Sequence, residues 1–172
     1  MTRAYDKVYL DRARTNLGRM LDYAVHDLKY NLEYFFELFL SSGMASRFET
    51  GDFTVLAGMS GVELAYEVLR LSREERQQIA PSYTVERSEE YWAGWALAYY
   101  QWETALSFEE IIEYIPIDDI VRMYSPYHEM DVSQFCDRMI ELYNKRKNKT
   151  NLKALRLDAG LSQSELAEIS DI

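Results

Sequence analysis

Along most of this chain, apolar residues recur at steps of three and four positions, which is the spacing of an amphipathic helix. No segment shows the strict alternation that is typical of a β-strand. An all-α fold is therefore expected, with a compact multi-helix body of six or seven helices. The apolar stripes predict helices over residues 7–42 (one long helix, or two that meet near Asn31), 60–72, 86–105, 117–124 and 131–147.

Serine followed three positions later by glutamate marks a helix start, because each side chain can bond the other residue's backbone N–H. This pairing occurs at Ser72–Glu75, Ser107–Glu110 and Ser162–Glu165. It predicts a short helix that stops before Pro81, a helix that ends at Pro116, and a final helix that opens at Ser162. Residues 43–61 predict a loop, a helical turn or a brief extended piece, and residues 125–131 predict a loop.

The composition is that of a globular protein with ample material for a core, because hydrophobic residues make up 48% of the 172 residues. The one cysteine, Cys136, excludes an internal disulfide and is expected to be buried in its helix. The charged N-terminus does not read as a secretory signal, and the most apolar run, residues 34–40, is too short to cross a bilayer. A cytoplasmic protein with no membrane contact is expected.

Acidic and basic residues are unevenly distributed along the chain. Residues 1–143 hold 13 basic and 25 acidic residues, a net charge of −12, whereas residues 144–156 hold six basic residues and no acidic one. An acidic body repels nucleic acid, while a local cluster of lysine and arginine attracts its phosphates. We therefore expect one domain over residues 1–145 and a basic linker after it, which either is only solvated or also contacts phosphate.

The segment from Thr150 to Ile172 carries the most specific pattern. Leu152 and Leu155 lie on an apolar-periodic helix that ends at Gly160, and a capped helix opens two residues later. The pattern L-R-x-x-x-G-L-S-Q-x-x-L-A resembles the helix-turn-helix of the phage-repressor/Cro family, over roughly the last seventh of the chain. The alternative is an ordinary helical hairpin in which the glycine is a plain C-cap.

This resemblance implies a DNA-binding transcriptional regulator with its reading head in residues 146–172. In that family the base-reading helix follows directly, whereas this sequence stops at Ile172, so we expect a truncated chain with weak, sequence-independent DNA binding. The resemblance also implies that the helix start at Ser162 and Gln163 contacts phosphate. With the basic segment, the expected contacts to the DNA backbone are Lys145, Arg146, Lys147, Lys149, Lys153, Ser162 and Gln163.

Four aromatic residues follow one face of the helix predicted over residues 86–105, namely Trp92, Trp95, Tyr99 and Trp102. This aromatic stripe is expected to face the core, because the helices of a small domain need a large apolar surface to pack. The alternative is a surface that binds a partner, since the chain has 14 tyrosines and exposed tyrosine favours protein contacts.

The only concentrated group of acid–base or metal-binding side chains is His128-Glu129-x-Asp131. His26 is the only other histidine and H-E-x-x-H is absent, so structural roles are favoured, with Asp131 as a helix N-cap. The glycines of residues 51–61 match no phosphate-binding motif and predict ordinary turns. We expect no enzyme activity, no cofactor and no metal.

These observations favour a regulator whose acidic helical body dimerises or binds a partner or effector, and so positions two reading heads on DNA half-sites. The expected partners are DNA and a second copy of the chain in a homodimer, with a protein partner as a further option. The alternative function is an antitoxin-like interaction module that neutralises a basic partner protein, which an acidic, tyrosine-rich body would suit.

Overall fold

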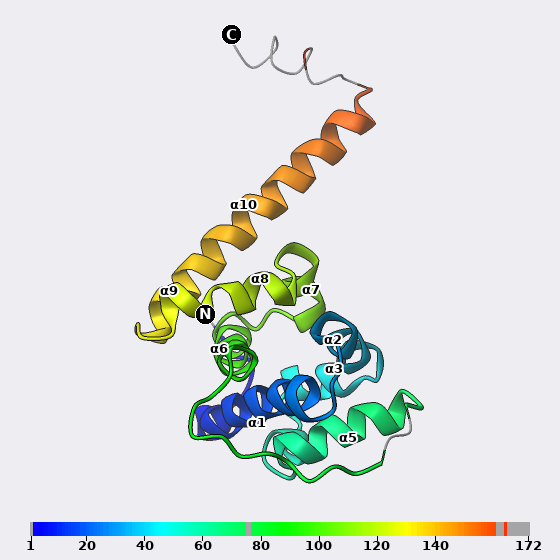
Figure 1. Ribbon diagram of the computed structural model, residues 1–172. Coiled ribbons are helices and arrows are strands. Elements are labelled where there is room, and N and C mark those ends of the chain that lie inside the picture. Colours follow the sequence, from blue (N-terminus) through cyan, green and yellow to red (C-terminus); the bar gives the residue numbers. More distant parts are fainter. Residues whose placement is uncertain (1, 75–76, 161–163, 165–172) are drawn as a thin grey trace.

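The computed structural model describes residues 2–74, 77–160 and 164, and within them the chain is all-α, as expected (Figure 1). Two short turns, η1 (Lys7–Tyr9) and η2 (Tyr23–Asp27), flank the first long helix. The helices are α1 (Leu10–Asp22), α2 (Leu32–Ser41), α3 (Met44–Glu49), α4 (Phe53–Leu56), α5 (Gly61–Leu71), α6 (Glu89–Thr104), α7 (Phe108–Tyr114), α8 (Ile117–Arg122), α9 (Tyr124–Tyr127) and α10 (Val132–Asp158).

The apolar stripe over residues 7–42 forms two helices, and the predicted break at Asn31 is confirmed. α1 runs into the π-turn η2, Lys29 takes a left-handed φ of 61°, and α2 begins directly after Asn31. The Asn31 side chain accepts a hydrogen bond of 3.0 Å from the Tyr34 N–H. That bond satisfies one of the amides that have no partner within the first turn of α2.

Helices α1 and α6 cross at the centre of the body, where two glycines bring their backbones into contact (Figure 1). A Cβ built on Gly94 of α6 would lie 2.7 Å from the Leu17 carbonyl oxygen of α1. A Cβ built on Gly18 of α1 would lie 2.6 Å from the Tyr91 carbonyl oxygen of α6. Only glycine permits this approach, so the crossing determines which face of α6 turns toward the core.

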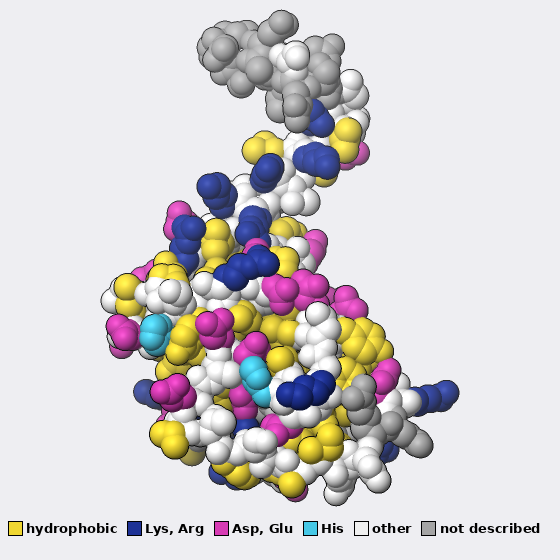
Figure 2. Space-filling view, viewed as in Figure 1, with side chains coloured by type: hydrophobic (Ala, Val, Ile, Leu, Met, Phe, Trp, Pro, Cys, Tyr) yellow, Lys and Arg dark blue, Asp and Glu magenta, His cyan; other side chains and the backbone are white. Residues whose placement is uncertain are grey.

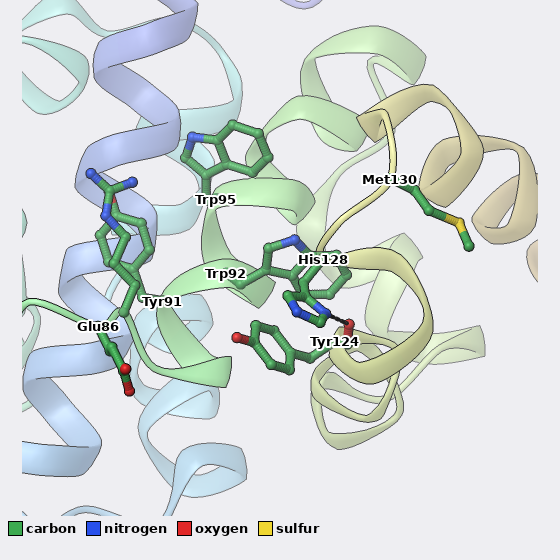
Figure 3. A pocket seen from close by; sticks show the side chains of 8 residues that line it. Glu86, Tyr91, Trp92, Trp95, Tyr124, His128 and Met130 are labelled. Atoms are coloured by element: carbon green, nitrogen blue, oxygen red, sulfur yellow. Dashed lines mark hydrogen bonds between the residues drawn. The ribbon is translucent and has the colours of Figure 1, made fainter.

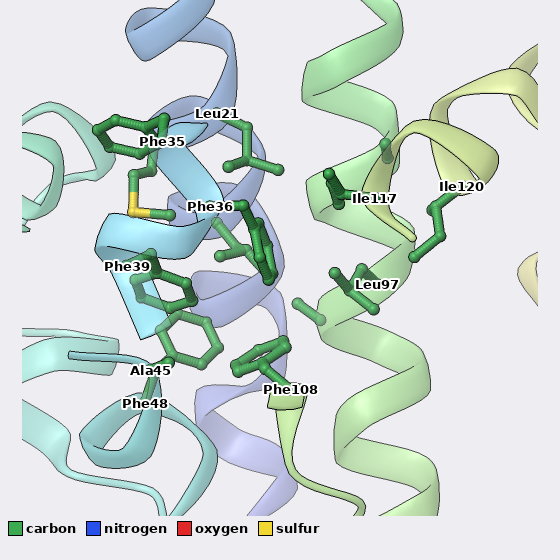
Figure 4. Packing of buried hydrophobic residues seen from close by; sticks show 14 of the residues in the cluster. Leu21, Phe35, Phe36, Phe39, Ala45, Phe48, Leu97, Phe108, Ile117 and Ile120 are labelled. Carbon is green, nitrogen blue, oxygen red and sulfur yellow. The ribbon is translucent and has the colours of Figure 1, made fainter. Parts of the chain in front are cut away.

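Five phenylalanines from α2, α3 and α7 form the centre of the core (Figure 4). Four of the rings, those of Phe36, Phe39, Phe48 and Phe108, lie 5.5 to 6.3 Å apart between centroids in edge-to-face pairs. The fifth, Phe35, packs on the Tyr30 ring at 5.7 Å, and each of the five side chains is at most 1% exposed. Such pairs contribute favourable contact energy beyond the apolar area that they bury. The five residues are Phe35, Phe36, Phe39, Phe48 and Phe108.

The helix predicted between Ser72 and Pro81 does not form in the described residues, because Ser72 ends α5 instead of opening a new helix. Arg73 takes a left-handed φ of 58°, its N–H donates to the Arg70 carbonyl, and the Glu74 N–H donates to the Leu69 carbonyl. These are the two hydrogen bonds of a Schellman C-cap, with arginine in the position that glycine usually occupies. Residues 77–87 then follow an irregular path back toward α6.

Other predicted helix starts are confirmed. Ser107 and Glu110 form the reciprocal capping box of α7, and α7 ends before Pro116. A second capping box, between Ser60 and Glu63, opens α5 at the start of the helix predicted over residues 60–72. The glycine-rich residues 43–61 contain α3 and α4, and the segment predicted as a loop over residues 125–131 begins within α9.

α10 is one helix of 27 residues, so it continues well beyond Lys147, where the sequence predicted its end. Lysine, arginine and leucine are good helix formers, and no glycine or proline interrupts residues 132–158. The segment expected to be a linker is therefore helical, while the domain boundary itself stays a prediction. Figure 1 shows α10 projecting from the body. The helix ends at Asp158 with Ala159 as its C-cap, and the left-handed Gly160 (φ 65°) follows, which confirms the predicted helix end.

Candidate functional site

The first half of α10 is anchored to the body. The Asp131 carboxylate accepts a hydrogen bond of 2.9 Å from the Ser133 N–H, which confirms Asp131 as the N-cap. Cys136 is buried as predicted, with 3% exposed surface, and this burial raises the pKa of its thiol to about 12. Such a thiol stays protonated at neutral pH and packs as a small apolar side chain. Phe135, Met139 and Tyr143 are buried on the same side of α10.

Arg146 lies where α10 leaves the body, and it binds protein groups. Its Nη1 donates to the Tyr114 carbonyl oxygen at 2.8 Å and to Asp119 Oδ2 at 2.9 Å. Arg146 thus ties α10 to α7 and α8, and its expected phosphate contact stays a prediction. Lys147 is exposed, and its ammonium donates to the hydroxyl of Tyr143, one turn earlier on α10, at 3.4 Å.

Three lysines, Lys145, Lys149 and Lys153, are exposed on the outer part of α10. They recur every four residues, so they form a row along one side of the helix with a rise of about 6 Å per step. None of the three forms an ion pair with the described part of the chain. The row is thus available to an external anion. The other expected phosphate contacts, Ser162 and Gln163, lie outside the described residues.

The outer part of α10 also carries exposed leucines. Leu152, Leu155 and Leu157 are 61%, 66% and 61% exposed. Large apolar side chains at this exposure are unusual on a helix that stands alone, since helical stability in proteins comes mostly from packing an apolar face. Cationic and apolar side chains therefore alternate on the part of α10 that projects from the body.

The aromatic stripe on α6 lies at the margin of the core and only partly inside it. Trp102 is buried, with 6% exposed surface, whereas Trp92, Trp95 and Tyr99 are half-buried and pack against the core from its edge. The expectation of a core-facing stripe is thus correct for Trp102 and only partly correct for the others. The close crossing with α1 at Gly94 explains this, because it turns the small residues of α6 inward and the indoles sideways.

One arginine of α1, Arg14, covers two members of the stripe. The Arg14 guanidinium lies 3.3 Å from the centre of the Trp95 ring and 4.9 Å from that of Tyr99. Arg14 is 9% exposed, and its Nε and Nη2 atoms have no hydrogen-bond partner among the described residues. Burial lowers the pKa of Arg14. The stripe therefore stabilises a buried cation through the faces of its rings, and a guanidinium covers that side of Trp95.

A pocket of about 480 Å³ opens between α6, α9 and the segment that leads into α10 (Figure 3). Its volume falls within the range of small-molecule sites. Figure 3 shows Tyr91 and Glu86 on one side, Tyr124 and His128 on the other, and Trp92 between them. The lining residues are Glu86, Arg87, Tyr91, Trp92, Trp95, Tyr124, His128 and Met130.

Of the His128-Glu129-x-Asp131 group, His128 and Glu129 stay close to each other, whereas Asp131 has a separate role. The His128 ring stacks on Tyr124 at 4.2 Å, and its Nδ1 lies 2.9 Å from the Tyr124 carbonyl oxygen. Its Nε2 lies 3.7 Å from a Glu129 oxygen, while Asp131 caps α10. Among the described residues, no three histidine, cysteine or carboxylate side chains gather as a metal-binding group.

Comparison of the chain with protein-family models, with curated proteins and with solved structures gives no match. The functional argument therefore depends on the chain's own chemistry. No helix in the described residues is both long and apolar enough to span a membrane.

Proposed function

We propose that this chain is a DNA-binding transcriptional regulator of the helix-turn-helix kind, in which an acidic body carries a basic helix to DNA. The row of exposed lysines on α10 (Lys145, Lys149 and Lys153) is the observation that carries the proposal. Three ammonium groups along about 12 Å of one helix suit consecutive phosphates of a nucleic-acid backbone. Contacts of this kind supply affinity and position the protein without reading sequence.

The distribution of charge over the molecule supports the same proposal. Figure 2 shows lysine and arginine side chains along α10, whereas acidic side chains are spread over the body beneath it. The body of residues 1–143 has a net charge of −12, so it would be repelled by DNA. A projecting helix reduces this repulsion, because it holds the cationic surface away from the acidic body.

The end of α10 agrees with the helix-turn-helix resemblance. Gly160 takes the left-handed conformation that ends the helix, at the glycine of the L-R-x-x-x-G-L-S-Q pattern. Leu152, Leu155 and Leu157 remain exposed just before it. An apolar surface at this point is what a small helical reading head would pack against.

The proposal is tested by a salt titration of DNA binding with the full-length product of the gene. The variant replaces Lys145, Lys149 and Lys153 together by glutamine. If all three lysines contact phosphate, the slope of log affinity against log salt should become shallower by roughly three units, because each lost contact removes about one. The affinity should fall by similar factors for different duplexes.

A matched control removes three exposed cations of the body, by changing Lys7, Arg12 and Lys29 to glutamine. This control changes the net charge by the same amount but leaves α10 intact, so its salt slope should equal that of the parent. Equal slopes for the parent and the α10 variant, or an equal loss in the control, would show that α10 does not meet the phosphates.

A further inference from the structure

The pocket lined by α6, α9 and the segments that precede α6 and α10 has the features of a small-molecule site. Its walls are aromatic and held in place by one another: the Trp92 ring packs edge-to-face on Tyr124 at 5.8 Å and on Phe135 at 5.3 Å. Tyr91 is 7% exposed, and the His128 ring is stacked on Tyr124 at 4.2 Å. Rigid aromatic walls of this kind favour a flat apolar group, in stacked or edge-to-face contact.

Two opposite charges lie at the rim of the pocket. Glu86 and Arg87 are adjacent in sequence, both are exposed, and both line the pocket. The Arg87 guanidinium lies 4.5 Å from the centre of the Tyr91 ring. In the described residues neither side chain takes part in an ion pair, so a carboxylate and a guanidinium are both left to interact with a ligand.

We infer that this pocket binds an aromatic α-amino acid or a close analogue. The flat side chain would lie among Trp92, Tyr124 and Tyr91, the ammonium group would face Glu86, and the carboxylate would face Arg87. Arginine binds carboxylates with two parallel hydrogen bonds, and charge-assisted bonds of this kind are among the stronger polar contacts in proteins. A zwitterion with an aromatic group is the ligand class that uses all of these lining groups at once.

The pocket also lies next to the N-terminal end of α10. A bound ligand could therefore affect the helix that carries the proposed DNA contacts. Met130 lines the pocket and immediately precedes Asp131, the N-cap of α10. Trp92 packs on Phe135, which is in the first turn of the same helix. A ligand in the pocket would therefore change the angle at which α10 leaves the body, and with it the DNA affinity. This regulatory part rests on the proposed function, whereas ligand binding does not.

Binding is tested with the 172-residue chain by calorimetry and by tryptophan fluorescence, since Trp92 and Trp95 line the pocket. The three probes are phenylalanine, phenylethylamine, which lacks the carboxylate, and phenylpropionate, which lacks the ammonium group. We expect phenylalanine to bind at least about tenfold more tightly than either analogue. Absence of saturable binding of phenylalanine at millimolar concentrations would overturn the proposal, as would equal affinity for the three probes.

Two substitutions at exposed positions test the charges of Arg87 and Glu86 one at a time, without disturbing the core. Arg87→Gln should weaken phenylalanine binding about tenfold. It should leave phenylethylamine binding unchanged, because this amine has no carboxylate that could bind Arg87. Glu86→Gln should weaken phenylalanine binding and leave phenylpropionate binding unchanged. Arg12→Gln and Glu37→Gln remove the same charges at exposed positions outside the pocket, and should bind phenylalanine as the parent does. Losses of equal size in these controls would contradict the assignment.

The coupling to DNA is measured with the full-length product, by comparing its DNA affinity with and without saturating phenylalanine. We expect at least a fivefold change, in either direction, and no change in the Arg87→Gln variant. Ligand binding with unchanged DNA affinity would overturn the regulatory part. If the protein binds no DNA but still binds phenylalanine, the proposed function fails while the ligand site stands.

Discussion

Replacing Gly94 by alanine should destabilise the body, because the crossing of α1 and α6 leaves no room for a methyl group. The added Cβ would lie 2.7 Å from the Leu17 carbonyl oxygen, and 2.9 Å from both the Cα and the backbone nitrogen of Gly18. Non-bonded atoms of this kind pack at about 3.5 to 4.0 Å. The two helices would therefore have to separate by roughly 1 Å along a contact that is buried on both sides.

The magnitude follows from two opposing effects. Overpacking a close-packed core costs about 1–3 kcal/mol, and the upper part of this range applies here because backbone atoms cannot rotate away as a flexible side chain can. Alanine in place of glycine stabilises the helix by about 1 kcal/mol, because alanine has the higher helix propensity. We therefore expect a net loss of about 2 kcal/mol in the free energy of unfolding.

The assay is urea unfolding followed by far-ultraviolet circular dichroism, with the slope of the transition compared between variants. Thr15→Ala is the control, since Thr15 is an exposed position on α1 and its replacement leaves the crossing untouched. It should change stability by less than about 0.5 kcal/mol. A Gly94→Ala protein as stable as the parent, or more stable, would refute the close crossing on which the placement of Trp92 and Trp95 depends.

Three further predictions concern single side chains. Asp131→Ala should cost about 1 kcal/mol in urea unfolding, because α10 loses its N-cap, and an unchanged midpoint would contradict that role. Cys136 should react with a thiol reagent at pH 8 only after denaturation, since its pKa is about 12 in the folded protein; rapid labelling of native protein would show that the thiol is accessible. Hydrogen bonds from Thr54 and Arg47 lower the pKa of Asp52 to about 2, so its stabilising effect is complete above pH 4 and lost as the pH falls toward 2. Asp52→Asn should flatten the pH dependence of stability in that window, and a profile parallel to that of the parent would contradict these bonds.

Helix starts could be predicted from sequence wherever a side chain satisfies local backbone groups. The bonds at Asn31, Ser107 and Asp131 depend only on residues within one turn, so local sequence determines them. The same local pattern was misleading at Ser72. There the chain ends α5 with Arg73 in a left-handed conformation, which sequence reasoning assigns to glycine.

The continuity of α10 can be predicted from the sequence, because residues 132–158 contain no helix breaker. The change of charge after residue 143 is a competing signal, and it favours a linker. The partners of Arg146 cannot be predicted from the sequence. Tyr114 and Asp119 come from helices about 30 residues earlier, and only the packed structure brings them to α10.

The aromatic pocket could be predicted only in part. Trp92 and Trp95 were identified by their spacing, but spacing alone does not show which face of α6 turns inward, and the glycine contact with α1 decides that. Tyr124 and Met130 lie in or beside a segment that was predicted as a loop, so no periodic pattern placed them near α6. The density of aromatic residues over residues 124–128 was the available signal.

The most direct test of the central claim is selection of DNA from a pool of random duplexes by the full-length product of the gene. We predict that one sequence is enriched over successive rounds, with two-fold symmetry if the protein binds as a dimer, and that its affinity falls steeply as salt rises. A folded, helical protein that enriches no sequence from the pool would contradict the assignment as a DNA-binding regulator.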